Sequence, residues 1–305
     1  MSSALPVLIN RNGGTAARLG DALGDVVTEA FAQAGRPIVL ELLDAQEIPD
    51  ALRAYAGKPV VAVGGGDGTI GTAAAVLANT MTALAILPLG TRNHLARQLG
   101  VPLDIPGAAE VAVSGQRRRI DLGRANGRVF INNASFGLYT RFVRERDAGD
   151  RHSYRRMVRA AWQVVRHMRA QFFTLRVDGR RQAIATPLLF VGNNEYSLEL
   201  GHVGERDSLT DHELSLLALP DKGPLQMISF AVRTLLGRGE PENDFLEYGR
   251  ATEVVIEGAG AIEGTFDGEV VVLPLPLHLR TLPNALGVVT PRESVPHERA
   301  LTHSH

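Results

Sequence analysis

The sequence predicts an α/β domain with a parallel sheet followed by a mostly antiparallel β domain, and three observations lead to this prediction. At 305 residues the chain is longer than one hydrophobic core usually covers. Before about residue 120, short apolar strands alternate with segments of helical period, which implies parallel strand pairing. After that point, strand-like runs follow one another with turn signals between them. We therefore place the first domain at residues 1–122 and the second at residues 123–290.

The first domain consists of strands and helices in alternation. Residues 15–34 carry apolar side chains at helical spacing, whereas residues 60–63 form a short apolar run typical of a buried strand. The expected strands are 6–9, 38–43, 60–63 and 84–87, and the expected helices are 15–34, 47–56, 70–78 and 93–99. Strands separated by helices in this way predict a three-layer α/β sandwich.

The second domain is dominated by runs of β-branched and aromatic residues. Asp178-Gly179 and Asp267-Gly268 are two-residue hairpin signals. The expected strands are 128–132, 173–177, 184–191, 213–219, 253–257, 270–273 and 277–282, with helices at 153–171 and 225–236. Residues 291–305 are polar and contain two prolines, so we expect a loose tail whose three histidines are solvated and do not bind metal.

Composition narrows the function classes. The chain has no cysteine, which excludes disulfides, thiolate metal sites and cysteine nucleophiles. Its net charge of −1 argues against general nucleic-acid binding, which requires a basic surface. No window approaches 18 consecutive apolar residues and no signal peptide is recognisable, so a cytoplasmic location is expected. No stable protein partner is predicted, and a homodimer stays open.

A glycine-rich turn at residues 64–68 is the first candidate site. It follows a buried strand and precedes a helix, a geometry in which free amides and the helix dipole bind anions. A plain strand-to-helix turn is the alternative, but it rarely needs four glycines in five positions. No Lys-Ser or Lys-Thr follows, so this is not a Walker A loop. The dinucleotide pattern at residues 66–71 lies on the third strand, and the next strand lacks an acidic residue for a ribose, which disfavours a Rossmann dehydrogenase.

Asp67 is the informative residue of this turn. A carboxylate in an anion-binding loop would repel phosphate unless a cation lies between them or the carboxylate takes part in catalysis, and Mg²⁺ resolves the conflict. Two further loops, Asn10 to Gly14 and the turn at Gly90-Thr91, follow neighbouring strands of the predicted parallel sheet. Because the carboxyl ends of parallel strands share one edge, all three loops can face one ligand.

Five motifs along the chain resemble those of one family. They are Gly65-Gly66-Asp67-Gly68-Thr69, Pro88-Leu89-Gly90-Thr91-Arg92-Asn93 with Leu95-Ala96-Arg97, Asn132-Asn133 before Phe136-Gly137, Gly192-Asn193-Asn194, and Asp267-Gly268-Glu269. Their order and spacing resemble the diacylglycerol kinase catalytic-domain family, which includes bacterial lipid kinases and is related to sphingosine kinases. The resemblance extends from Val7 to about Thr281.

The resemblance implies a fold like that of NAD kinase and diacylglycerol kinase, with a nucleotide-binding α/β domain, a β-sandwich lipid-substrate domain and an active site between them. It implies ATP and Mg²⁺ as cofactors, with transfer of the γ-phosphate to a hydroxyl of diacylglycerol or a related lipid. Glu269 would be the general base, although without the resemblance residues 266–270 are simply a hairpin turn. The residues expected to bind ATP are Asn10, Arg11, Asn12, Gly13, Gly14, Gly65, Gly66, Asp67, Gly68, Thr69, Thr91 and Asn93, with Asp67 also a metal ligand and a catalytic residue.

The resemblance also implies a structural Mg²⁺ in the second domain, held by Ser208, Asp211 and Glu213. The family usually has glycine where His212 stands, and a solvated turn is the alternative. Two departures fall in the second glycine turn, where Arg92 and His94 replace the usual glycine and aspartate. They put rate, metal use or substrate in question, because histidine is not an anion and titrates near neutral pH.

Three functions therefore stay open: a lipid kinase, an NAD kinase-like enzyme with a soluble acceptor, and a non-catalytic protein that binds nucleotide or lipid. Retention of Asp67, Thr69 and Glu269 argues against the last. A lipid kinase would meet its substrate at the inner face of the membrane. The arginine-rich helix expected at 153–171 could lie on anionic lipid, but packing of its apolar stripe on the protein's own core is favoured.

Overall fold

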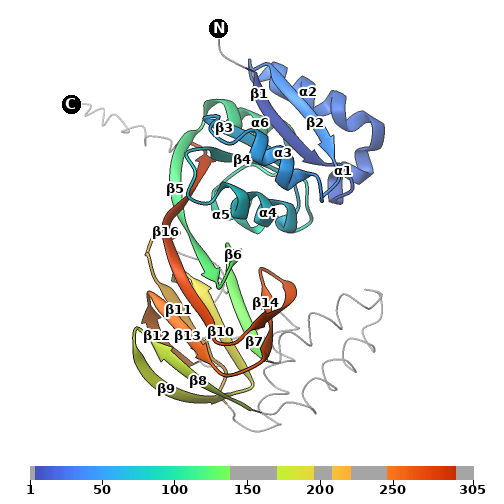
Figure 1. Ribbon diagram of the computed structural model, residues 1–305. Helices are drawn as coiled ribbons and strands as arrows, with labels where there is room; N and C mark the ends of the chain where they lie inside the picture. The colour runs from blue at the N-terminus through green and yellow to red at the C-terminus, as the bar shows by residue number, and fades with distance from the viewer. Residues whose placement is uncertain (1–3, 138–169, 196–207, 221–245, 293–305) are drawn as a thin grey trace, which may run out of the picture.

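The computed structural model describes residues 4–137, 170–195, 208–220 and 246–292 (Figure 1). The helix expected at 225–236 and residues 293–305 of the expected tail lie outside these ranges, as does nearly all of the helix expected at 153–171. That helix was expected to reach Gln171, which instead begins a strand. No helix in the described ranges is both long enough and apolar enough to span a membrane.

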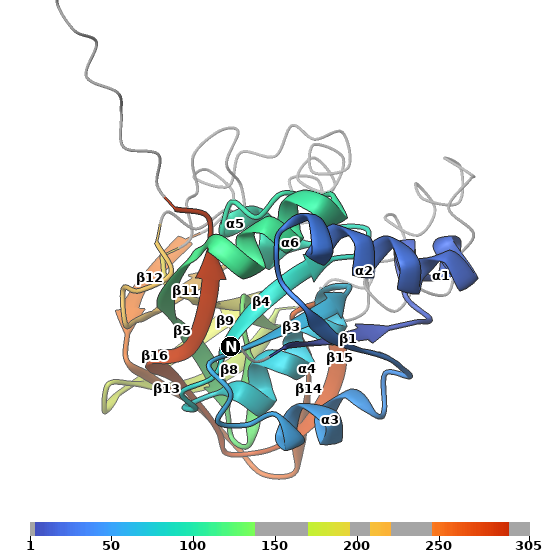
Figure 2. The ribbon, with the colours of Figure 1, turned by 90° about the horizontal axis from the view of Figure 1, so that it is seen from above.

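The N-terminal part contains four parallel strands in the order β2-β1-β3-β4. β3 and β4 are buried along nearly their whole length, as strands covered on both faces must be. Helices α2 and α6 pack together over one face of the sheet, and α3 and α4 pack over the other, so the expected three-layer arrangement is confirmed (Figure 2). The bounds are β1 Leu5–Asn10, β2 Ile38–Leu43, β3 Val60–Gly65, β4 Ala83–Pro88, α2 Leu23–Gln33, α3 Ile48–Ala54, α4 Asp67–Leu77 and α6 Ile105–Ser114.

The helices of this part differ from the prediction in two places. The single helix expected at 15–34 is divided into α1 (Gly14–Leu19), a 3-10 turn at Gly20–Ala22 and α2, because Gly20 adopts a φ of 53° and ends α1. Helix α6 was not predicted, since Pro106 and Gly107 resemble helix breakers. Both lie in its first turn, where proline is tolerated, and the Asp104 carboxylate caps the helix by accepting the Gly107 amide at 2.7 Å.

Two long strands connect the N-terminal and C-terminal parts of the molecule. β5 (Gln116–Ala125) and β16 (Leu277–Thr290) pair antiparallel along their length (Figure 1). One end of β16 pairs with β4 and packs in the first core, and its other end pairs with β13 (Glu253–Glu257). The first sheet thus continues into the second part, and the boundary at residue 122 stays a prediction.

The C-terminal part is mostly antiparallel, as expected. A six-stranded sheet, β12-β11-β10-β7-β14-β15, packs across a second core against β8, β9, β13 and one end of β16 in the first sheet. Phe130, Phe136 and Phe266 form the aromatic centre of that core, with ring centroids 5.9 and 6.0 Å apart. The bounds are β6 Arg128–Phe130, β7 Asn133–Gly137, β8 Gln171–Val177, β9 Arg180–Thr186, β10 Leu188–Asn193, β11 Leu214–Ala218, β12 Leu246–Ala251, β14 Ala261–Phe266 and β15 Glu269–Pro274.

Both predicted hairpins are confirmed. The two residues of each turn have positive φ, at 43° and 83° for Asp178-Gly179 and at 49° and 89° for Asp267-Gly268, as a type I′ turn requires. The strand expected at 184–191 is instead two strands, β9 and β10, separated at Pro187. β5, β7, β12 and β14 were not predicted.

Candidate active site

Three loops meet where β1, β3 and β4 end, and we call this region the glycine edge: residues 10–14, 65–69 and 89–93. Direct contacts join them. The Thr15 amide donates to Leu89 O at 2.7 Å, and Asn10 Nδ2 donates to Thr69 Oγ1 at 3.0 Å. A methyl group placed on Gly90 would lie 2.4 Å from Gly66 Cα, so the second and third loops touch through their backbones. The arrangement therefore brings the predicted loops to one place.

The glycines of the glycine edge serve packing as well as anion binding. A methyl group on Gly65 would lie 2.5 Å from Thr69 Cβ, and one on Gly14, where φ is 49°, would lie 2.3 Å from Leu89 O. Helix α4 begins here with Gly66 as its N-cap, and no side chain caps it. The first-turn amides of an uncapped helix are available to an anionic ligand.

Asp67 ties two of these loops together. Its Oδ1 accepts the His94 amide at 2.7 Å, which caps α5 (His94–Gln98). Because the carboxylate lies at the N-terminal ends of both α4 and α5, the two helix dipoles favour its charge. Asp67 is half-buried, and its Oδ2 makes no hydrogen bond to the residues that the structure describes. One carboxylate oxygen therefore stays available to a ligand.

That oxygen fits Mg²⁺ in donor chemistry. Mg²⁺ prefers oxygen ligands and is commonly held by one or two carboxylates together with substrate phosphates and water. Within the described ranges, no group of three His, Asp or Glu side chains could hold a metal without such help. A metal at the glycine edge would therefore depend on nucleotide oxygens as well as on Asp67.

The side chains of Asn10 and Asn93 shape the loops that carry them. Asn93 is buried with a φ of 52°, its Oδ1 accepts the Gly90 amide at 2.9 Å, and its Nδ2 donates to Gly90 O at 2.8 Å. Asn10 Oδ1 accepts the Asn12 amide at 3.1 Å. In this arrangement the amide group of Asn93 holds main chain, and that of Asn10 holds the Asn12 amide and the Thr69 hydroxyl. Their expected binding of ATP stays a prediction.

Arg11 and Asn12 point to Asp44, a residue that was not predicted as part of the site. Asn12 Nδ2 donates to Asp44 Oδ1 at 2.8 Å, and Arg11 Nε lies 3.5 Å from the same oxygen. The Arg11 guanidinium also donates to Leu42 O. Asp44 immediately follows the second strand, so an acidic residue at the end of a neighbouring parallel strand was the available signal.

Glu269 reaches the glycine edge from the other side. Its Oε1 lies 3.2 Å from where a methyl group on Gly68 would be, so this carboxylate faces the first turn of α4. Its Oε2 accepts a hydrogen bond from Arg128 Nη2 at 2.6 Å. Glu269 and Asp67 thus approach the same helix N-terminus from different parts of the chain.

Asp267 fixes the turn that carries Glu269. Its Oδ2 accepts the Ile131 amide at 2.7 Å and its Oδ1 accepts the Asn132 amide at 2.7 Å, while its own amide donates to Asn133 O at 3.0 Å. The carboxylate therefore locks the turn onto main chain between β6 and β7. Neither this role nor Arg128 was predicted from the sequence.

Comparisons with known proteins agree with this geometry. Residues 4–125 match the family model described as "Diacylglycerol kinase catalytic domain". A Pseudomonas aeruginosa protein named "Probable lipid kinase YegS-like" is 30% identical over 255 residues, which covers 79% of this chain and 80% of that protein. The chain belongs to the diacylglycerol kinase catalytic-domain family. It is accordingly a phosphotransferase with an alcohol group as acceptor, and ATP is its phosphate donor.

Further matches extend the likeness. A Citrobacter koseri protein, also named "Probable lipid kinase YegS-like", is 35% identical over 144 residues, which covers 46% of this chain and 48% of that protein. The structure described as "a putative diacylglycerol kinase from Bacillus anthracis str. Sterne" superposes with a TM-score of 0.71 at 23% identity and covers 96% of each chain. The kinase fold therefore extends over both parts of the molecule.

The departures of this family member at Arg92 and His94 leave the glycine edge intact. Both side chains are exposed. The contacts made here are main-chain contacts: the His94 amide donates to Asp67, and Arg92 O accepts from Arg97 Nε at 2.9 Å. Any residue other than proline at position 94 would supply that amide, so the replacement of aspartate changes the charge of the edge but not its construction.

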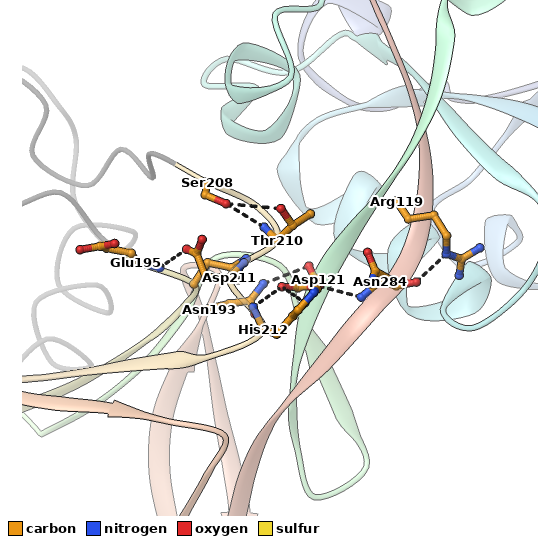
Figure 3. Close-up of polar contacts among 10 residues, drawn as sticks. Arg119, Asp121, Asn193, Glu195, Ser208, Thr210, Asp211, His212 and Asn284 are labelled. Atoms are coloured by element: carbon orange, nitrogen blue, oxygen red, sulfur yellow. Dashed lines mark hydrogen bonds and ion pairs between the residues drawn. The ribbon is translucent and has the colours of Figure 1, made fainter.

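The residues predicted to hold a second Mg²⁺ lie on the segment before β11. Figure 3 shows two of them, Ser208 and Asp211. Asp211 Oδ2 accepts the Glu195 amide at 3.0 Å, Ser208 Oγ accepts the Thr210 amide at 3.1 Å, and Glu213 O accepts the Asn194 amide at 2.9 Å. Of the two carboxylate oxygens of Asp211, Oδ1 makes no hydrogen bond to the residues that the structure describes. A cation there would rely mainly on main-chain carbonyls, and this site stays a prediction.

His212, between these residues, contacts the buried carboxylate of Asp121 (Figure 3). Its φ of 64° is a left-handed conformation that glycine adopts without steric cost. The His212 amide donates to Asp121 Oδ2 at 2.8 Å, and its ring Nδ1 lies 3.0 Å from Asp121 Oδ1. Histidine at this position thus connects the segment before β11 to strand β5.

Proposed function

We propose that this chain is an ATP-dependent lipid kinase that transfers the γ-phosphate of ATP to a hydroxyl of diacylglycerol or a related lipid. The observation that carries the proposal is the position of Glu269, whose Oε1 faces Gly68 at the start of α4. A carboxylate from the C-terminal part beside an anion-binding helix end is suited to accept a proton from an acceptor hydroxyl. The names of the curated relatives support a lipid as that acceptor.

The triphosphate would lie along the glycine edge. Uncapped amides at the start of α4 and the glycine backbone of the three loops suit phosphate oxygens. Thr69 Oγ1 accepts from Asn10, so its own hydroxyl hydrogen is free to donate to a phosphate. Asn10 and Asn93 would act by holding these loops in register, and Thr91 is exposed on the same edge.

Asp67 would hold Mg²⁺ through the oxygen that the His94 amide leaves available. When bound, the metal neutralises charge on the phosphates during transfer. Positioning by the chain's own amides and neutralisation of charge carry most of the catalysis, because phosphoryl transfer requires little covalent work by the protein.

Glu269 would accept the hydroxyl proton through Oε1 as the acceptor oxygen attacks the γ-phosphorus. We place this reaction at a bilayer surface on the cytoplasmic side, where a lipid hydroxyl is within reach. The lipid itself is the partner in this proposal.

The test is transfer of labelled γ-phosphate from ATP to a panel of lipids in mixed micelles with Mg²⁺. Wild-type protein is compared with Glu269→Ala and with Glu253→Ala, which removes an exposed glutamate of β13. We expect label in one lipid class, lost in Glu269→Ala and retained in Glu253→Ala. Label in a soluble acceptor such as NAD, with none in any lipid, would instead identify the NAD kinase-like alternative.

A further inference from the structure

Arg128 on β6 is held in place by two contacts with its surroundings. Its Nη2 donates to Glu269 Oε2 at 2.6 Å, and its guanidinium lies over the Phe266 ring, 5.9 Å from the ring centroid. Its Nε is buried and makes no hydrogen bond to the residues that the structure describes. Phe266 and Glu269 flank the Asp267-Gly268 turn, so Arg128 contacts both sides of the hairpin that carries the proposed base.

This contact fixes the orientation of the Glu269 carboxylate relative to the glycine edge. The last torsion of a glutamate side chain is soft, so an unrestrained Glu269 could present either oxygen in many orientations. Pairing of Oε2 with Arg128 leaves Oε1 as the oxygen beside Gly68. Because the pair is partly exposed, with side-chain exposures of 35% and 58%, it contributes little to folding stability. Its main consequence is the orientation of Glu269.

We propose that Arg128 is a positioning residue for phosphoryl transfer, which holds the Glu269 carboxylate with Oε1 toward the acceptor hydroxyl. This inference rests on the proposed function, in which Glu269 is the base. The acceptor O–H bond breaks as the new O–P bond forms, the bond from the γ-phosphorus to the bridging oxygen breaks, and ADP leaves. The proton goes to Oε1, while Arg128 keeps its charge and its hold on Oε2.

The surroundings of Arg128 favour a guanidinium over an ammonium group. A planar guanidinium can lie on an aromatic ring and donate to a carboxylate at the same time. Lysine at position 128 would keep the charge but lose the contact of the guanidinium with the Phe266 ring. We therefore expect Arg128→Lys to restore part of the function that Arg128→Met removes.

The chain offers a matched control for this contact. Arg176 Nη2 donates to Glu257 Oε1 at 2.6 Å, the same distance as in the Arg128–Glu269 pair. The Arg176 pair joins β8 to β13, away from the glycine edge. Arg176→Met thus removes an ion pair of the same length without touching Glu269, and Glu257 keeps Arg181 as a second partner at 3.0 Å.

The experiment measures kcat and KM for ATP with the lipid that the panel identifies. We expect Arg128→Met to lower kcat on the order of 10²-fold, the cost of a misplaced catalytic group, with KM for ATP changed less than about threefold. Arg128→Lys should have an intermediate kcat, and Arg176→Met should match wild type. An unchanged kcat in Arg128→Met, or an equal loss in Arg176→Met, would overturn the inference.

A double variant separates this inference from the proposed function. If Arg128 acts through Glu269, adding Arg128→Met to Glu269→Gln should lower kcat no further, because coupled residues are not additive. A full additional loss would mean that Arg128 acts independently of Glu269. If Glu269→Gln alone keeps full activity, the proposed function itself fails. Should Arg128→Met not fold, Arg128→Lys decides: a reduced kcat at unchanged KM supports the inference, and an unchanged kcat contradicts it.

Discussion

The glycine edge and the pair of connecting strands, β5 and β16, both depend on a carboxylate that accepts main-chain amides, but the two carboxylates differ in exposure. Asp67 is half-buried and accepts one amide, from His94, so one oxygen stays available. Asp121 on β5 is 1% exposed, and both of its oxygens are occupied. The difference indicates that a half-satisfied carboxylate can serve a ligand, whereas a fully satisfied one serves the architecture.

Asp121 completes a β-bulge in the β5–β16 pair. The register of β5 and β16 shifts between Leu282 and Leu286, and the Asn284 amide in this bulge donates to Asp121 Oδ1 at 2.7 Å (Figure 3). Arg119 donates to the bulge carbonyls, Asn284 O at 2.6 Å and Ala285 O at 3.2 Å. His212 is the one ionisable group in contact with Asp121 among the described residues. A buried carboxylate requires partners of this kind.

The largest expected effect is loss of stability on Asp121→Ala. Three amide or imidazole donors would lose their buried acceptor, and each part-buried donor left unsatisfied costs about 1–3 kcal/mol. Urea unfolding should therefore show a fall of that size in the free energy of unfolding. A loss below about 1 kcal/mol would mean that Asp121 is not the architectural group described here.

Asp67→Asn should show the opposite division of effects. The asparagine oxygen can still accept the His94 amide, so the melting temperature without nucleotide should change little. Loss of the charge should lower kcat by roughly 10–100-fold, as for changes around a metal site. The stabilisation of the wild-type protein by ATP with Mg²⁺ should shrink in the same variant. Equal stabilisation of both proteins would argue against Asp67 as a metal ligand.

Gly90→Ala tests whether the glycine edge depends on close backbone contact. The added methyl group would lie 2.4 Å from Gly66 Cα and must push the two loops apart, at a cost of about 1–3 kcal/mol. ATP binding should weaken as well, which nucleotide titration measures.

Gly71→Ala is the matched control, because nothing lies within 4 Å of the added methyl group in the interior of α4. There we expect stabilisation of roughly 0.5–1 kcal/mol, since alanine is the better helix former. The two glycine variants should therefore change stability in opposite directions.

The two regions also differ in how far the sequence predicts them. The glycine edge was predicted because each strand, glycine turn and helix is contiguous in sequence, and parallel pairing then brings the loops together. Asp121 and Arg128 were missed because their partners are distant. Asn284 lies 163 residues from Asp121, Glu269 lies 141 residues from Arg128, and no local pattern connects them. The role of Asn93 in closing its own turn was not predicted either, and its expected contact with ATP stays a prediction.

The smallest expected effect comes from the ion pair between Arg176 on β8 and Glu257 on β13. The hydrogen bond from Arg176 is the main cause that lowers the pKa of Glu257 below its ordinary value of 4.5, and Arg181 acts in the same direction. A carboxyl whose pKa is lowered on folding contributes stability above its unfolded pKa and loses that contribution as pH falls through the folded pKa. Wild type should therefore melt slightly above Glu257→Gln near neutral pH, and the gap should close in acid. If the gap instead widened as pH fell, the carboxylate would not be the stabilising form.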